Sequence, residues 1–88
     1  MNEIKIGDYV ESLRGRDTNN VYIVKQVDGE YIYLVDGKGK TVDKPKKKKI
    51  KHVKSLNQNC KILAEKFANK MNVFDAEIRK HIRNIENS

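Results

Sequence analysis

The chain has 88 residues, of which 38% are hydrophobic and 35% charged, and its formal net charge is +7. This length favours one small domain with a thin core. The single cysteine, Cys60, excludes an internal disulfide, and no apolar run approaches the roughly 18 residues of a membrane-spanning helix. Because the first residues also lack the apolar region of a signal peptide, we expect a cytoplasmic protein.

The positive charge is concentrated in one stretch. Residues 38–54 contain nine Lys and one Asp, a net charge of +8, so the other 71 residues sum to −1. A local basic patch on a nearly neutral body is typical of proteins that bind a polyanion, either a nucleic acid or an anionic membrane.

The N-terminal half predicts short antiparallel strands. Three segments rich in β-branched and aromatic residues cover 9–13, 21–27 and 31–35. The sequence Asp28-Gly29-Glu30 predicts a tight hairpin between the second and third segments, and the run 36–39 predicts another turn.

Two further short strands are expected inside the basic stretch, at 40–43 and 47–50. Pro45 lies between them, where a missing N–H is tolerable. Val53 and Leu56 then follow at a spacing of three residues, which we interpret as a closing helical turn. Short strands separated by turns at this spacing predict a small antiparallel barrel.

Residues 57–88 predict two short helices. Asn57-Gln58-Asn59 is a polar break with candidate N-cap residues, and 69–72 is a stop and restart. Each helix is too short to be stable alone, so we expect residues 57–88 to form a helical hairpin packed on a barrel of residues 1–56. The apolar residues at helical spacing are Cys60, Leu63, Ala64, Phe67 and Met71, then Phe74, Ile78, Ile82 and Ile85.

The loop RGRDTNN joins the first two predicted strands. Gly15 permits a positive φ and close approach of another backbone, and Asn19 also tolerates the left-handed region. Arg14 and Arg16 flank the glycine, and arginine binds phosphate bidentately and stacks on bases. The loop therefore suits docking on an RNA backbone, although an ordinary hairpin loop with solvated arginines and an Asp17 turn cap explains it as well.

Several short motifs occur in a fixed order over most of the chain. They are Gly7-Asp8, Ser12, Gly15-Arg16-Asp17, Asp36-Gly37-Lys38, Lys44-Pro45-Lys46-Lys47-Lys48-Lys49, Lys51-His52 and Ala76-Glu77-Ile78-Arg79-Lys80. Residues 7–37 resemble the KOW motif of several ribosomal proteins and transcription elongation factors. The whole chain is similar to the bacterial KOW-domain RNA-binding proteins, which are related to a KOW-containing large-subunit ribosomal protein of archaea and eukaryotes.

This resemblance implies a five-stranded SH3-like barrel with a helical tail that binds structured RNA. The expected partners are ribosomal RNA and the ribosome, and the protein is expected to be a monomer when free. Two positions depart from the pattern: Asn19 stands where a second Gly is usual, and Gly39 stands where a larger residue is common. Composition and spacing alone predict only a small β-rich domain with a polyanion patch.

The candidate RNA-binding residues lie in the Gly15 loop and in the basic stretch. Lys46–Lys49 would alternate faces in a strand, which suits an edge strand. A solubilising edge is the alternative, but one or two lysines suffice for that. We expect the lysines to bind phosphate with little base readout. The candidates are Arg14, Gly15, Arg16, Asn19, Asn20, Lys38, Lys40, Lys44, Lys46, Lys47, Lys48, Lys49, Lys51, His52 and Lys54.

The aromatic residues allow two interpretations. Because Tyr31–Val35 is apolar on both faces, part of the outer face of the barrel must be covered or used. Tyr31 and Tyr33 either offer a base-stacking platform or belong to the core, and the same holds for Tyr9 and Tyr22. His52 either contacts RNA or helps to close the barrel.

No pattern of catalysis or metal binding is visible in the sequence. His52 and His81 are far apart, and Cys60 lies on an apolar helix face as a small hydrophobic residue. We therefore expect neither an enzyme nor a cofactor. Two other functions stay open: a protein-interaction adaptor that uses the barrel or residues 74–85, and DNA or membrane-surface binding through charge alone. The resemblance argues against the last.

Overall fold

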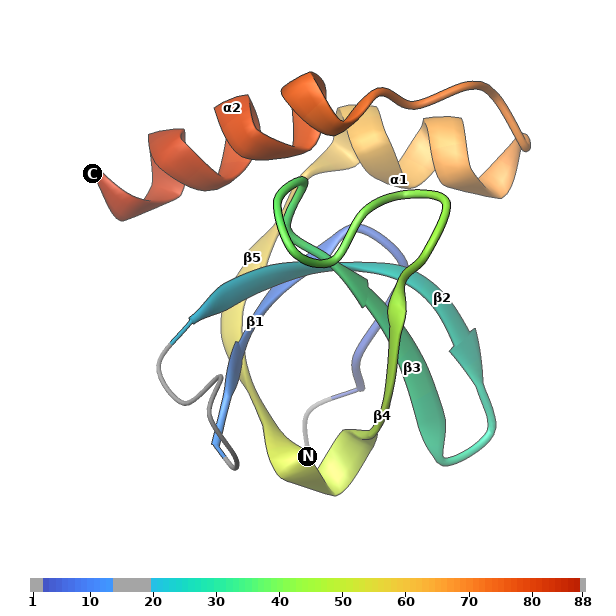
Figure 1. The fold of residues 1–88 in the computed structure, drawn as a ribbon. Coiled ribbons are helices and arrows are strands. Elements are labelled where there is room, and N and C mark those ends of the chain that lie inside the picture. The colour runs from blue at the N-terminus through green and yellow to red at the C-terminus, as the bar shows by residue number, and fades with distance from the viewer. Residues whose placement is uncertain (1–2, 14–19, 88) are drawn as a thin grey trace.

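The computed structural model of the protein describes residues 3–13 and 20–87. Its strands form one antiparallel sheet in the order β4-β3-β2-β1-β5, and the two helices lie together on one side of it (Figure 1). A mainly β fold with a helical tail is thereby confirmed. The elements are β1 (Asp8–Ser12), β2 (Val21–Asp28), β3 (Tyr31–Val35), β4 (Lys46–Lys49), the 3-10 turn η1 (Ile50–His52), β5 (Val53–Asn59), α1 (Lys61–Ala68) and α2 (Asp75–Glu86).

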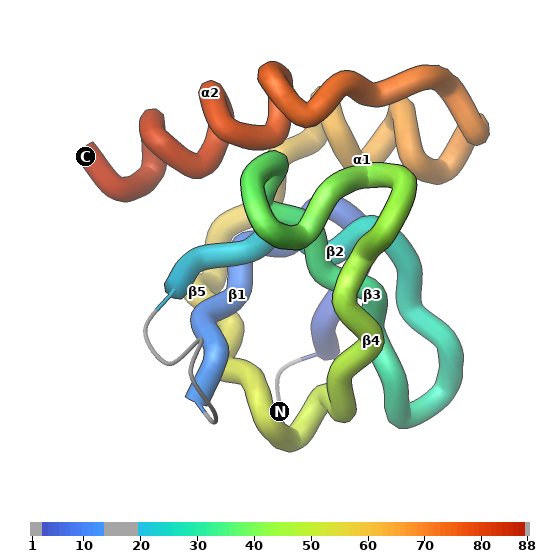
Figure 2. Tube along the Cα trace, in the orientation of Figure 1, coloured from blue at the N-terminus to red at the C-terminus, as the bar shows by residue number. Residues whose placement is uncertain are grey.

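The sheet is strongly curled, as the chain trace in Figure 2 shows. Its edge strands β4 and β5 are consecutive in the chain and are joined by the short η1 turn. In the described parts of the chain, each strand pairs with its neighbours in this order, and no pairing joins β4 directly to β5. Where the sequence predicts a barrel, the structure has a barrel-like sheet whose two edge strands are not paired with each other.

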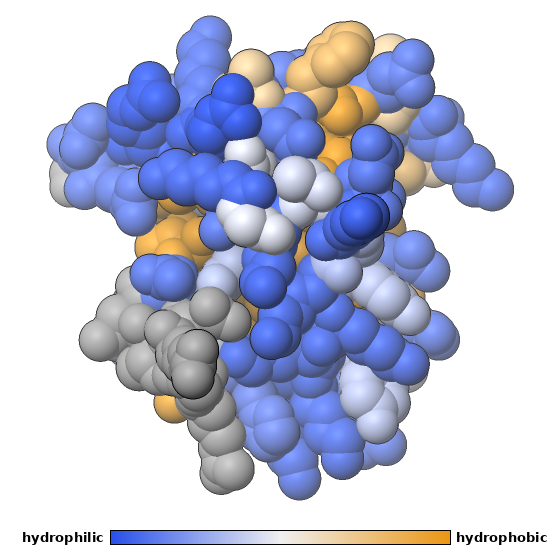
Figure 3. Space-filling model, viewed as in Figure 1, coloured by the Kyte–Doolittle hydropathy of each residue, from blue (hydrophilic) through white to orange (hydrophobic). Residues whose placement is uncertain are grey.

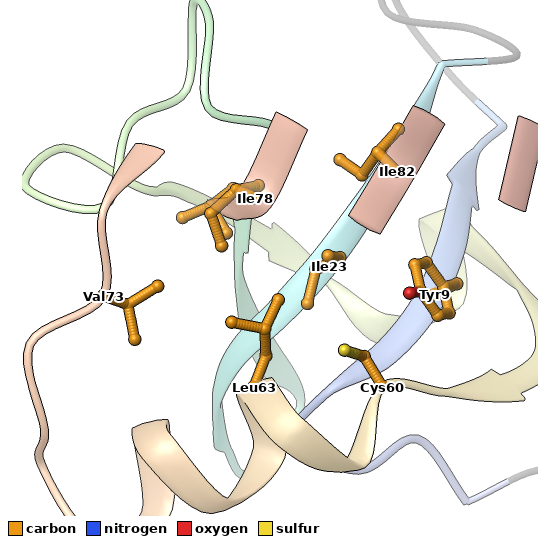
Figure 4. Close-up of a cluster of buried hydrophobic side chains, with 8 residues drawn as sticks. Tyr9, Ile23, Cys60, Leu63, Val73, Ile78 and Ile82 are labelled. Carbon is orange, nitrogen blue, oxygen red and sulfur yellow. The ribbon is translucent and has the colours of Figure 1, made fainter. Parts of the chain in front are cut away.

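Each face of the sheet buries its own cluster of side chains, because successive residues of a strand point to opposite faces. The inner cluster, enclosed by the curled sheet, consists of Val10, Tyr22, Val24, Ile32, Leu34 and Val53. The outer cluster lies between the sheet and the helices (Figure 4) and consists of Tyr9, Ile23, Val35, Cys60, Leu63, Val73, Ile78 and Ile82. Burial of each such large apolar side chain stabilises the fold by about 1.5–3 kcal/mol, so the helices are required to cover the outer face.

Helix α1 is fixed to the turn that precedes β1. A Cβ on Gly7, whose φ is +88°, would lie 2.5 Å from the Cβ of Ala64. The N–H of Cys60 donates to the carbonyl of Gly7 at 2.8 Å, and the N–H of Gly7 donates to the carbonyl of Val24 at 2.8 Å. The glycine therefore allows helix and sheet backbones to approach closely.

An ion pair between Lys66 and Glu77 joins the two helices, and the Glu77 carboxylate also accepts the N–H of Phe74 at 3.0 Å. These two interactions, with Lys66 the stronger, lower the pKa of Glu77. On the outer cluster, burial raises the pKa of the Tyr9 phenol, and the neighbouring Cys60 raises it further.

The strand expected at residues 40–43 is wrong. Instead, the Asp36 carboxylate accepts the backbone N–H groups of Lys38 and Lys40 at 2.8 and 2.9 Å, and the N–H of Lys44 donates to the carbonyl of Thr41 at 3.1 Å. Aspartate commonly stabilises turns in this way, and the side-chain bonds satisfy backbone groups that a strand would have paired with a neighbour.

The expected helical turn over Val53 and Leu56 is also wrong. The turn occurs earlier, at η1, and Val53–Asn59 forms β5, which pairs with β1 from Ser12↔Val53 to Asp8↔Asn59. The predicted polar break at 57–59 therefore belongs to a strand, and the N-cap of α1 is Cys60, without a side-chain cap.

Two residues of the predicted helix faces are exposed. Met71 is 56% exposed because α1 ends at Ala68, and Phe74 is 69% exposed because it caps α2 from outside the helix. The other members of those faces are buried or half-buried, as the spacing predicts.

Candidate nucleic-acid interface

Strand β4 is made entirely of lysine. It comprises Lys46–Lys49, follows directly after Pro45, and lies at the edge of the sheet with β3 as its only strand neighbour in the described sheet. The predicted basic edge strand is therefore confirmed. Ile50, at its end, packs partly buried against the inner cluster and so anchors the strand.

The register between β3 and β4 divides the four lysines between the two faces of the sheet. Lys46 and Lys48 lie opposite Leu34 and Ile32, whose side chains are buried in the inner cluster. Residues directly opposite in an antiparallel pair project from the same face, so Lys46 and Lys48 point to the inner side. Lys47 and Lys49 lie opposite Tyr33 and Tyr31 and point outward.

The side chain of Lys48 reaches across the inner side of the sheet to β1. Its Nζ donates to the Oγ of Ser12 at 2.6 Å, and Ser12 is fully buried. A buried hydroxyl must be hydrogen-bonded, and the ammonium provides a partner for it. Lys48 thus joins the edge strand to β1 as a structural element, in contrast to its two neighbours.

On the outer face, lysines lie over an aromatic ring. The Nζ of Lys47 is 4.4 Å from the centroid of the Tyr31 ring, and that of Lys49 is 5.9 Å away. Tyr31 and Tyr33 are half-buried and belong to neither cluster, whereas Tyr9 and Tyr22 are 7% and 2% exposed. The core interpretation therefore holds for Tyr9 and Tyr22 only.

The loop between β3 and β4 carries Lys38, Lys40 and Lys44, and helix α2 holds this loop in place. The guanidinium of Arg79 donates to the carbonyl of Gly37 at 2.6 Å. In addition, the Asp75 carboxylate accepts the N–H of Val42 at 2.9 Å, and the Nζ of Lys25 donates to the carbonyl of Val42 at 3.0 Å. Figure 1 shows the loop rising from the sheet toward the helices.

Lys38 and Lys44 are exposed, and Lys40 is half-buried. The far end of the basic stretch lies on η1 and β5. Lys51 and Lys54 are exposed there, and His52 is half-buried. The carbonyl of His52 accepts the N–H of Leu13 at 3.0 Å, so the backbone at this position ties η1 to the end of β1.

In Figure 3, hydrophilic residues predominate in the lower centre and right of the view, over β4 and η1, and hydrophobic residues show mainly near the helices.

Of the predicted RNA-binding loop, only Asn20 is described; Arg14, Gly15, Arg16 and Asn19 lie outside the described residues. Asn20 is exposed, and its carbonyl accepts the N–H of Ser12 at 3.2 Å. The docking role of this loop stays a prediction.

A hollow that the sequence did not indicate lies at the end of β4, between η1 and the β2–β3 hairpin. Its volume is about 360 Å³, and it is lined by Gly29, Glu30, Lys49, Ile50 and Lys51. The N–H of Ile50 donates to the carbonyl of Glu30 at 2.8 Å and so fixes η1 against the β2–β3 hairpin. Larger hollows of 870 and 650 Å³ lie elsewhere, around Asp8 and Asn59 and around Val42 and Met71.

Comparison of the chain with protein-family models and with curated proteins gives no match. In the part of the chain that the structure describes, no three His, Cys, Asp or Glu side chains are grouped so that they could bind a metal ion. None of the described helices has the length and apolar character needed to cross a membrane.

Proposed function

We propose that the protein is an RNA-binding module that docks on structured RNA, with ribosomal RNA as its expected target, through the basic edge of the sheet. The observation that carries the proposal is the all-lysine edge strand β4, from which Lys47 and Lys49 project beside a tyrosine that is not part of the core. This strand lies within the stretch that holds a net charge of +8. A dense cationic surface of this kind suits a phosphate backbone.

The lysines act as point charges on phosphate groups. An ammonium group has no fixed fork geometry, so it accepts many phosphate orientations and carries little sequence information. The loop held by α2 adds Lys38 and Lys44, and η1 and β5 add Lys51 and Lys54. Docking by shape and charge is how proteins recognise the backbone of folded RNA.

RNA is favoured over an anionic membrane by the position of the apolar groups. Membrane-surface binding combines basic residues with apolar groups that enter the lipid on the same side. Three of the four large apolar residues that are exposed in the described part of the chain, Ile62, Met71 and Phe74, lie on or beside the helices. The fourth, Leu13, lies after the end of β1, whereas Lys47 and Lys49 flank a tyrosine on the opposite edge region of the sheet, at β4. The resemblance to KOW-domain RNA-binding proteins favours RNA over duplex DNA.

Co-sedimentation with ribosomes at low and at high salt tests the proposal. We expect the wild-type protein to travel with ribosomes at low salt and to be released as salt rises. The double variant Lys47→Glu/Lys49→Glu should stay at the top of the gradient, because it places two negative charges at the phosphate-facing positions. The matched control is Lys61→Glu/Lys80→Glu, which makes the same charge change on exposed helix positions. Wild-type protein that stays at the top even at low salt would disprove the ribosome assignment.

A protein-interaction adaptor is the second candidate, and the exposed Ile62, Met71 and Phe74 are the observation that favours it. Partner binding that survives Lys47→Glu/Lys49→Glu but is lost on Phe74→Ser would establish this alternative in place of RNA binding.

A further inference from the structure

We propose that Tyr31 is a stacking site for one unpaired base of the bound RNA, with Lys47 and Lys49 holding the adjoining phosphate. This inference rests on the proposed function, and it adds a single-stranded element to an interface otherwise built on phosphate contacts.

The first observation is the position of the ring. Tyr31 lies on the outer face of β3, on the same side as Val35, but the helices cover only the Val35 end. Tyr31 therefore remains half-buried outside both clusters. An aromatic ring on the open face of a strand is a sequence-tolerant stacking surface, since every base has a π-face.

The second observation is the cation above the ring. With its Nζ 4.4 Å from the centroid, Lys47 covers the Tyr31 ring in the free protein, and Lys49 lies next to it. A nucleotide carries a planar base and a charged phosphate side by side. A base can replace the ammonium on the ring while the displaced Lys47 binds the phosphate of the same nucleotide. Stacking of a base on an aromatic side chain is stronger than an exposed cation–π contact, so the exchange is favourable.

The third observation is the charge on either side of Tyr31. Lys49 lies opposite it on β4, and Asp28 lies opposite it on β2. The carboxylate of Asp28 repels phosphate and accepts hydrogen bonds from base amino groups. The phosphate is therefore directed toward β4 and the base toward β2.

The surroundings leave room for neighbouring nucleotides. Tyr33 occupies the next outward position, about 7 Å along the strand. The hollow of about 360 Å³ beside Lys49 and Lys51 lies at the other end, next to the β2–β3 hairpin. An unpaired strand can thus run along β3, with its backbone on the lysine side.

Two RNA hairpins with equal numbers of phosphates test the proposal. One is fully paired, and the other has a shorter stem and an unpaired 3′ extension that carries 2-aminopurine, whose fluorescence falls on stacking. We expect the wild-type protein to quench the 2-aminopurine and to bind the extended RNA more tightly. Tyr31→Ile should lower the affinity for the extended RNA about fivefold to a hundredfold and leave the paired RNA unaffected.

Tyr31→Phe is the matched control, because it keeps the ring and should bind both RNAs as the wild type does. Far-UV circular dichroism of each variant checks the fold, and the quenching of the wild-type complex needs no variant at all. Absence of quenching, or an equal loss on both RNAs with Tyr31→Ile, would overturn the stacking site. If Lys47→Glu/Lys49→Glu still abolishes binding in that case, the proposed function stands; if the wild type binds neither RNA, the proposed function itself fails.

Discussion

Outward and inward lysines of β4 should behave differently when they are replaced. Lys47 and Lys49 project outward, whereas Lys48 points inward and donates to the buried Ser12. We therefore predict that Lys47→Met/Lys49→Met weakens RNA binding without loss of stability, and that Lys48→Met lowers stability without a change in the electrostatics of binding.

The size of each effect follows from the structure. Within residues 38–54, five lysines are exposed, and the half-buried Lys49 also projects outward from β4, which gives six candidate phosphate contacts. If each neutralises one phosphate, log K should fall with log salt at a slope of about −4 to −5. The double variant removes two such contacts and should reduce the slope by about 1.5–2. Lys48→Met removes a part-buried hydrogen bond from a charged donor, which should lower the free energy of unfolding by about 1–3 kcal/mol.

Binding is measured by fluorescence anisotropy with a labelled RNA hairpin at several salt concentrations, and stability by urea unfolding followed by circular dichroism. Lys61→Met, on the exposed surface of α1, is the control for loss of a charge away from the interface. The alternation of faces in β4 would be refuted if Lys48→Met reduced the salt slope by half as much as Lys47→Met/Lys49→Met or more, or if the double variant destabilised the fold as much as Lys48→Met. A wild-type slope near −1 would show that the lysines do not dominate binding.

Two further predictions concern the parts that hold the interface together. Gly37→Ala should lower the free energy of unfolding by clearly more than Gly29→Ala. Both glycines have a positive φ, which costs an alanine about 1–2 kcal/mol. Only at Gly37 would the added Cβ also meet the carbonyl oxygen of Asp75, at 2.5 Å. Equal losses in urea unfolding would contradict this account. The pKa of Glu77 is lowered in the folded protein, chiefly by Lys66. The ionised Glu77 carboxylate therefore stabilises the fold above its unfolded pKa of about 4.3, and this stabilisation is lost as pH falls through its pKa in the folded state. The stability difference between the wild type and Glu77→Gln should therefore shrink from pH 7 to pH 3, and a difference independent of pH would speak against the ion pair.

Local sequence patterns predicted the central strands well. β2 and β3 combine β-branched and aromatic residues with a hairpin at Gly29, and both were placed within one residue of their ends. In contrast, β5 has the sequence VKSLNQN, which is polar and lacks regular alternation, and its pairing with β1 determines its structure. Non-local pairing of this kind leaves no local signal in the sequence.

The sequence predicted which residues form the candidate site, but not the face of the sheet from which each side chain projects. Four consecutive lysines after Pro45 indicate a basic edge strand, and that strand is present. The sequence could not assign faces, because a shift in register of one residue exchanges the inward and outward lysines. The bond from Lys48 to Ser12 and the contact of Lys47 with Tyr31 depend on this register, so they appear only in the folded chain.

The contacts of α2 with the β3–β4 loop give the helical tail a part in recognition even if it never contacts RNA. Arg79 and Asp75 hold the backbone at Gly37 and Val42, so the loop that presents Lys38 and Lys44 is ordered before any ligand arrives. Ordering a loop on binding would otherwise cost conformational entropy at every residue involved. Loss of the Arg79 and Asp75 contacts would leave every lysine of the loop in place and still weaken binding, because part of the binding energy would be consumed in ordering the loop.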